Sequence, residues 1–90
     1  MPMIHELAAM GRKSCRDLRT GDKYVTEYTV PAYREVKDEV IQFLRWTGAE
    51  RSVRDWDGNY IARDAIVRNL TTGVVRAHRF GMHCSVKVAK

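Results

Sequence analysis

The sequence predicts an α+β fold, with one main helix packed across an antiparallel sheet of four to five strands and a second helix at the N-terminus. Three observations lead to this prediction. Apolar residues recur at helical spacing between residues 31 and 48. The second half of the chain is rich in β-forming residues separated by turn signals. Ninety residues provide one small core, so residues 1–90 are expected to form a single two-layer domain.

The first predicted element is a helix over about residues 3–19. Its apolar residues recur at helical spacing: Ile4, Leu7, Ala8, Gly11, Cys15 and Leu18. Gly11 costs about 1 kcal/mol relative to alanine, so two shorter helices are the alternative. On one helix, Arg12, Arg16 and Arg19 share a side. That side either binds phosphates or places cations favourably in the C-terminal half of the helix.

A strand is predicted next, over residues 22–30, after a turn at residues 20–22. Strand alternation puts Tyr24 and Tyr28 on one face. We expect this face to belong to the core, with the tyrosine hydroxyls at its rim. The alternative is a platform on which nucleic-acid bases stack.

The main helix is predicted over residues 31–48. One stripe of this helix collects the apolar residues of the segment, together with a threonine: Tyr33, Val36, Val40, Phe43, Leu44 and Thr47. Pro31 suits a first helical turn, where its missing N–H has no intrahelical partner. Gly48 suits the residue that ends a helix. The helix dipole favours the acidic residues in the N-terminal half of this segment. This helix is expected to cover the sheet.

The strands are predicted to follow as hairpins. Asp57-Gly58 is a favoured two-residue turn, and a second turn is expected at residues 71–73. A helix over residues 60–70 also fits the apolar spacing, but the turn chemistry favours strands. A last strand is expected near the C-terminus, where an open edge at residues 86–90 would allow a homodimer as well as a monomer. Trp46 and Trp56 are both expected to be mostly buried.

The charge of +5 is unevenly distributed. Residues 65–90 carry five basic residues and no acid, residues 22–64 carry seven basic and nine acidic residues, and residues 1–21 have a net charge of +2. A polarised chain of this kind attracts a polyanion or an acidic protein surface. The sequence has no apolar run long enough for a membrane span and no signal-peptide pattern, so a cytoplasmic protein without a membrane partner is expected.

No motif for catalysis or for a cofactor is present in the sequence. Zinc-ligand residue types occur at spacings unlike those of structural zinc sites: His5, Cys15, His78, His83 and Cys84. Asp57 is better explained by its turn than by an acid–base pair with Asp55. The two cysteines are expected to be free thiols rather than a disulfide. We therefore predict no catalytic residues, no metal and no cofactor.

One enzyme class has a comparable architecture. The size, basic charge and predicted order of helices and antiparallel strands resemble those of small bacterial mRNA-cleaving toxins, although no sequence motif is shared. That resemblance implies metal-independent cleavage by arginine, lysine, histidine and tyrosine side chains around a phosphate. In this chain Arg76, His78, Arg79 and Lys87 would take those roles.

The favoured prediction is a non-enzymatic protein that binds and modulates a larger host or partner protein. The chain resembles, in size and character, the short accessory proteins of phages and mobile elements. The alternative is sequence-independent binding of RNA or DNA. Both functions would use basic residues, and the first would add aromatic anchors. The candidate partner-binding residues are Arg12, Arg16, Arg19, Arg68, Arg76, Arg79, Lys87, Trp56 and Tyr60.

Overall fold

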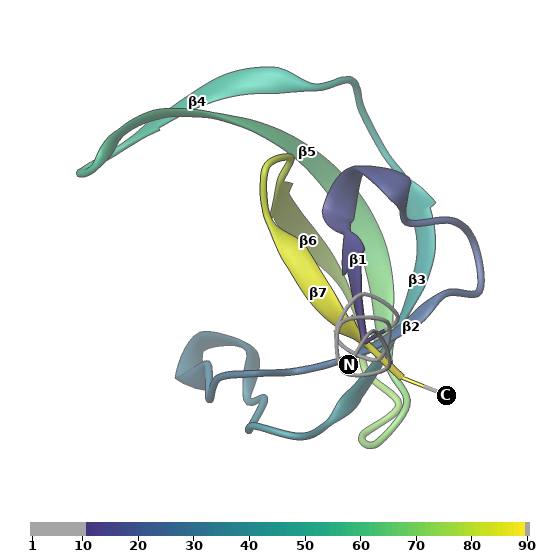
Figure 1. Cartoon of the computed structure of the whole chain (residues 1–90). Coiled ribbons are helices and arrows are strands. Elements are labelled where there is room, and N and C mark those ends of the chain that lie inside the picture. The colour runs from purple at the N-terminus through teal and green to yellow at the C-terminus, as the bar shows by residue number, and fades with distance from the viewer. Residues whose placement is uncertain (1–10, 90) are drawn as a thin grey trace, which may run out of the picture.

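The structure, a computed structural model, describes residues 11–89, and the regular structure of these residues is mainly strands joined by loops (Figure 1). The strands are β1 (Arg12–Ser14), β2 (Lys23–Val25), β3 (Val40–Trp46), β4 (Arg51–Asp55), β5 (Gly58–Asn69), β6 (Val75–Gly81) and β7 (Ser85–Val88). Within the described range the helical segments are two short 3₁₀ turns, η1 (Cys15–Asp17) and η2 (Pro31–Tyr33). The predicted α+β fold is therefore wrong, because the described chain is one β-sheet without a helical layer.

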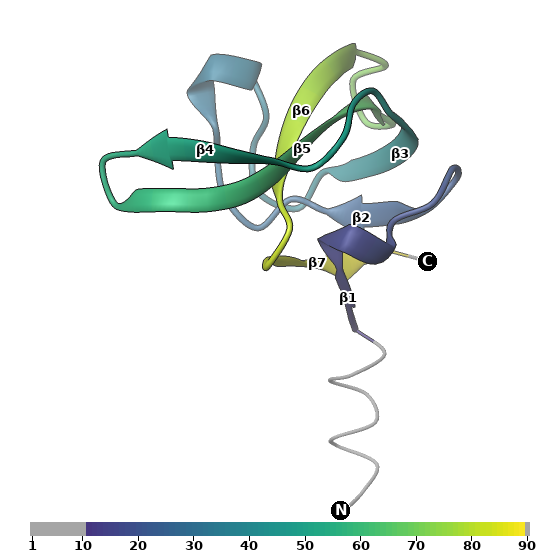
Figure 2. The ribbon, with the colours of Figure 1, turned by 90° about the horizontal axis from the view of Figure 1, so that it is seen from above.

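All pairings in this sheet are antiparallel, and the strand order is β1-β7-β2-β3-β5-β4. Strand β6 pairs with the other edge of β5, because residues 65–68 pair with β3 on one side and with β6 on the other. The sheet curls into a half-barrel, from which the β4–β5 hairpin projects (Figures 1 and 2). A curled sheet has an inner face that can be closed off from water and an outer face that cannot.

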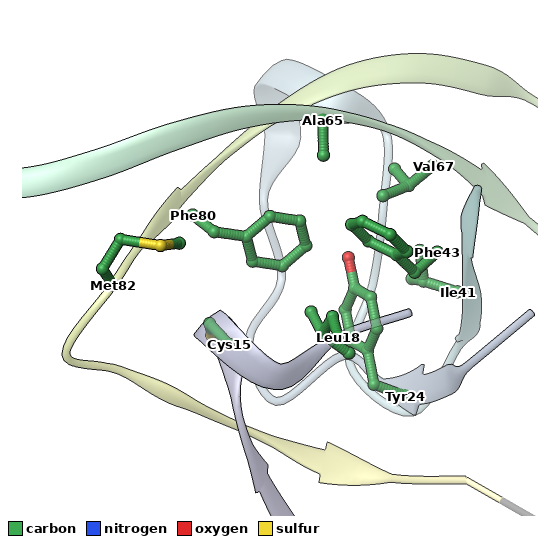
Figure 3. Packing of buried hydrophobic residues seen from close by; sticks show 9 residues of the cluster. All are labelled: Cys15, Leu18, Tyr24, Ile41, Phe43, Ala65, Val67, Phe80 and Met82. Atoms are coloured by element: carbon green, nitrogen blue, oxygen red, sulfur yellow. The ribbon is translucent and has the colours of Figure 1, made fainter. Parts of the chain in front are cut away.

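The core lies on the inner face of the curl (Figure 3). Strand alternation directs inward the largest apolar side chains that are fully buried: Ile41 and Phe43 from β3, and Val67 from β5. Phe80 of β6 makes edge-to-face contacts with Tyr24 and Trp46, whose ring centroids lie 5.8 and 5.6 Å from its own. Such ring pairs stabilise the core beyond the area they bury.

The predicted helix over residues 31–48 is absent. The segment begins with the 3₁₀ turn η2, passes through Arg34 and Asp38 with positive φ angles of 54° and 72°, and ends as strand β3. Val36, placed on the buried helical stripe, is 53 % exposed. The reason is that residues 40–43 also alternate with the period of a strand. Strand β3 pairs with β2 on one side and β5 on the other, and this tertiary pairing outweighs the local helical pattern.

The predicted N-terminal helix is also wrong where the structure describes it. Residues 3–10 of that prediction lie outside the described range, and so does His5. The remaining residues form β1, which pairs with β7, and then η1. Arg12 therefore lies on a strand, Arg16 in the 3₁₀ turn and Arg19 after it, so the three arginines do not share one helix side. Cys15 and Leu18 of this segment enter the core.

The predicted strands of the second half are confirmed. Residues 60–70 lie in β5 up to Asn69, so the helical alternative for them is wrong, and the second hairpin turns between Asn69 and Val75. The buried Asn69 side chain accepts hydrogen bonds from the N–H groups of Thr71 and Thr72, which fixes this turn. The open edge expected at residues 86–90 is wrong for the part that the structure describes, because β7 pairs with both β1 and β2. Strand β2 ends at Val25, so Tyr28 is 77 % exposed. Tyr24 is buried as predicted, but its hydroxyl lies inside the core rather than at the rim.

Candidate functional site

The β4–β5 hairpin forms an arm, residues 51–62, that extends beyond the half-barrel (Figures 1 and 2). Five register pairs join its two strands, from Arg51 opposite Ala62 to Asp55 opposite Gly58. Strand β4 pairs with β5 alone, so its other edge has no neighbouring strand within the described chain. The hairpin arm is thus a two-stranded ribbon anchored at its base by the continuation of β5 into the sheet.

The tip of the hairpin arm presents Trp56. The turn residues are Trp56 and Asp57, one position earlier than predicted, and Gly58 takes the positive φ angle of 122°. The Asp55 carboxylate accepts the Asp57 N–H at 2.8 Å, an Asx turn that fixes this conformation. Trp56 is 92 % exposed, so the prediction that it is mostly buried is wrong. Its turn lies at the tip of the hairpin arm, where the core residues do not cover the indole.

A hollow of about 300 Å³ lies between the hairpin arm and the β6–β7 turn. Its lining comes from the arm on one side, including Tyr60 and Ile61, and from Gly81, His83 and Cys84 on the other. Tyr60 is half-buried and lies opposite Val53 on the arm. The predicted partner-binding residues Trp56 and Tyr60 therefore lie on one element, at its tip and on its return strand.

A second group of polar residues lies on the inner face, and we name it the inner charge cluster: Glu35, Arg76, His78 and Tyr33. Arg76 donates two hydrogen bonds to the Glu35 carboxylate, at 2.7 and 2.8 Å, and its side chain is 13 % exposed. The Arg76 guanidinium also lies 3.8 Å from the centroid of the Tyr33 ring. The cluster fastens the loop of residues 26–39 to strand β6.

The His78 imidazole in this cluster is held neutral. Burial, together with the charge of Arg76, lowers the pKa of His78 to about 4, and the charge of Glu35 opposes this shift. Arg76 Nη1 lies 2.9 Å from His78 Nδ1. Since a guanidinium can only donate, Nδ1 is the acceptor and the imidazole proton lies on Nε2. The hollow of about 150 Å³ beside the cluster also meets Tyr28 and Val86.

The four residues assigned to a toxin-like active site do not converge. Arg76 and His78 lie together on the inner face, where Glu35 neutralises the arginine. Arg79 follows His78 along β6 and therefore points to the outer face, where it pairs with Asp64 at 3.1 Å. Lys87 lies opposite Val25 on β7, also on the outer face. No single phosphate can contact all four side chains in this arrangement.

The outer face of the sheet collects exposed cations from four strands. Lys23 lies opposite Gln42, and Gln42 lies opposite Arg68, so the side chains of this row share a face. Arg45 lies opposite Ile66, two residues from Arg68, and therefore joins the same face. We name Lys23, Arg45, Arg68 and Lys87 the outer-face cations. All four are exposed, and none forms an ion pair within residues 11–89.

The other predicted cations are engaged by carboxylates or stand apart. Arg12 makes a bidentate pair with Glu27, at 2.6 and 3.0 Å, and the hydrogen bond from Arg12 is the main reason that the pKa of Glu27 is lowered. Arg16 pairs with Glu50 at 3.0 Å. Arg19 is exposed beyond η1. Residues that sequence reasoning missed are Glu35, Lys23 and Arg45. Strand alternation alone would place Arg45 inward with Ile41 and Phe43; the register shift between Phe43 and Arg45 turns it outward, and no local signal in the sequence shows that shift.

The thiols do not form a nucleophilic centre. Cys15 and Cys84 are both free, and the Cys15 N–H donates to the Cys84 carbonyl oxygen at 3.0 Å. Burial raises the pKa of the Cys15 thiol to about 11, which disfavours the thiolate. Within residues 11–89, histidine, cysteine and carboxylate side chains nowhere gather in groups of three or more that could hold a metal ion. The helical segments of the same range are too short to cross a membrane.

Comparison of the chain with protein-family models, curated proteins and solved structures finds no match. Function must therefore be argued from the hairpin arm and the two faces of the sheet.

Proposed function

We propose that the protein binds a larger partner protein through the hairpin arm and modulates it, with Trp56 as the anchor. The observation that carries this proposal is the 92 % exposure of Trp56 at the end of a projecting hairpin. An exposed tryptophan leaves a large apolar surface in water, so a partner that covers it gains favourable apolar burial. Tryptophan, tyrosine and arginine are also the residue types that contribute most to binding at protein interfaces.

The construction of the hairpin arm suits this role. Strand pairing and the Asx turn fix the backbone on both sides of Trp56, so little backbone conformational entropy is lost when a partner covers the indole. Arg54, exposed beside the tip, makes no ion pair within the described residues. The partner surface that complements this tip is an apolar pocket for the indole with a carboxylate at its rim for Arg54.

The proposal is tested by capture from a nuclease-treated lysate of the cells that express the protein. Wild type is compared with Trp56→Ala and with a matched control, Val74→Ala, which trims an exposed apolar side chain of the β5–β6 turn. We expect one protein to be captured by wild type and control, and its affinity to fall by tenfold or more, or about 1.4 kcal/mol or more, for Trp56→Ala. Capture that is equal for all three proteins, or that disappears with nuclease, would contradict the proposal.

A further inference from the structure

The outer-face cations lie on one face of the sheet without a carboxylate partner among residues 11–89. Six ion pairs occur within residues 11–89, and they engage Arg12, Lys13, Arg16, Arg51, Arg76 and Arg79. Among strand residues of the outer face outside the hairpin arm, the one acid is Asp64, which is held by Arg51 and Arg79. Lys87 adds to the field that lowers the pKa of Glu27, but the carboxylate itself is bound by Arg12. Within residues 11–89 no carboxylate therefore forms an ion pair with these four cations, and their positive field is directed towards solvent.

The chemistry of this face differs from that of a protein-binding patch. Between the cations lie aliphatic residues and one amide, among them Val25, Gln42 and Ile66, and the aromatic residues of these strands outside the hairpin arm point to the inner face. A protein interface draws its energy from buried aromatic anchors, which this face lacks. Binding of single-stranded nucleic acid relies on aromatic rings for base stacking, which this face also lacks. What remains is an array of cations suited to backbone phosphates.

The spacing of the outer-face cations fits a duplex. Lys23 and Arg68 lie two strands apart in one register row, which is about 10 Å. The major groove of B-form DNA is about 12 Å wide, so such a row can reach the phosphates on both of its sides. The major groove of A-form RNA is too narrow to admit side chains, and its wide minor groove is read through 2′-hydroxyls rather than by cations alone.

We propose that the outer face is a second binding surface, for the phosphate backbone of double-stranded DNA, without sequence preference. Lys23, Arg45, Arg68 and Lys87 each contact a phosphate. This surface lies on the sheet rather than on the hairpin arm, so its function is independent of Trp56. A protein that modulates a DNA-bound partner would gain affinity from holding both, because the second contact becomes intramolecular.

The test is a titration of a short mixed-sequence DNA duplex in a salt series. Four phosphate contacts predict a slope of about −3.6 when the logarithm of the binding constant is plotted against the logarithm of the salt concentration. The affinity should therefore fall roughly hundredfold between about 50 and 200 mM salt. The variant Lys23→Gln/Arg68→Gln removes two contacts and should reduce the slope to about −1.8. The matched control is Arg34→Gln/Lys37→Gln, which removes the same charge from exposed positions of the loop of residues 26–39 and should retain the wild-type slope.

Three results would overturn the proposal. The first is no binding of duplex DNA at low salt. The second is an equal loss of slope in both double variants, which would mean that only net charge matters. The third is binding of an RNA duplex or a single strand as tightly as of the DNA duplex. Trp56→Ala should leave DNA binding unchanged, so failure of the DNA proposal and failure of the hairpin-arm proposal are separate results.

Discussion

Arg68 and Arg76 lie on neighbouring strands, one register step apart, and their charges meet opposite environments. Arg76 lies opposite the buried Val67 and faces inward, whereas Arg68 lies opposite the exposed Val75 and faces outward. The Arg76 side chain is 13 % exposed and makes a bidentate pair with Glu35. Arg68 is exposed and forms no ion pair with the described residues. The face of the sheet decides which arginine stabilises the fold and which remains free to bind.

This difference follows from desolvation. A charge on the inner face loses most of its water, so it requires a partner of opposite charge with good hydrogen-bond geometry. Glu35 meets this need from a loop 41 residues away in sequence, and the pair thereby ties the loop to β6. A charge on the outer face keeps its water and needs no partner. A net charge of +5 therefore says little about binding until each cation has been assigned to a face.

The largest effect that this comparison predicts is on stability. Arg76→Ala leaves the buried Glu35 carboxylate unpaired and should lower the free energy of unfolding by about 3–5 kcal/mol. Arg68→Ala should change it by no more than about 0.5 kcal/mol. Urea unfolding followed by circular dichroism measures both. Equal losses of unfolding free energy for the two variants would mean that the inner charge cluster does not hold the loop of residues 26–39 against strand β6.

A double variant separates the ion pair from the packing around it. Glu35→Gln/Arg76→Met removes both charges and keeps similar volumes, so it should recover much of the stability that Arg76→Ala loses. If the double variant is as unstable as Arg76→Ala, the loss comes from packing against Tyr33 rather than from an uncompensated charge.

The accuracy with which the sequence predicts secondary structure differs between the two halves of the chain. In residues 51–90, the turn residues around Gly58 and Gly73 delimit strands whose alternation is regular, so local rules were sufficient. In residues 31–48, Val40, Phe43 and Leu44 satisfy a helical period while Ile41 and Phe43 satisfy a strand period. Only the pairing of β3 with β2 and β5 decides between the two, and that pairing is not local.

The candidate site was predictable in part for the same reason. Arg68 and Lys87 could be proposed from charge alone, but their shared face depends on a register that runs through β2 and β3. The Glu35–Arg76 pair joins a loop to a distant strand, and no local signal connects them. The exposure of Trp56 follows from the length by which the hairpin arm exceeds the sheet, which turn chemistry does not determine.

A smaller effect is expected from acid, through His78. The pKa of His78 is lowered from 6.5 to about 4 in the folded chain, so the unfolded chain binds the proton more readily between these pH values. Stability should therefore fall as the pH drops from about 6.5 towards 4, by on the order of 2 kcal/mol. The groups that face the ring are Arg76, Glu35 and Tyr33, with Phe80 packed against it.

Unfolding midpoints in urea across this pH range measure the effect. His78→Gln keeps a hydrogen-bond acceptor for Arg76 but cannot titrate, so its stability should vary less with pH than that of wild type. The exposed His83 provides the control, because His83→Gln should retain the wild-type slope. The comparison is best made above about pH 5, since the ion-paired carboxylates Asp22, Glu27 and Asp64, with lowered pKa values, begin to lose their pairs only at lower pH. A slope that His78→Gln leaves unchanged would exclude His78 as its source.

The smallest effect on stability is expected at the residue proposed to matter most for binding. Trp56→Ala should change the free energy of unfolding by no more than about 0.5 kcal/mol, because the indole is 92 % exposed. Phe43→Ala, an aromatic truncation on the inner face at a residue that is 1 % exposed, should cost about 3–5 kcal/mol. A loss above about 1 kcal/mol for Trp56→Ala would show that the indole packs on the protein's own surface. Without such a loss, the fold gives no reason for a tryptophan at this turn, and contact with a partner does.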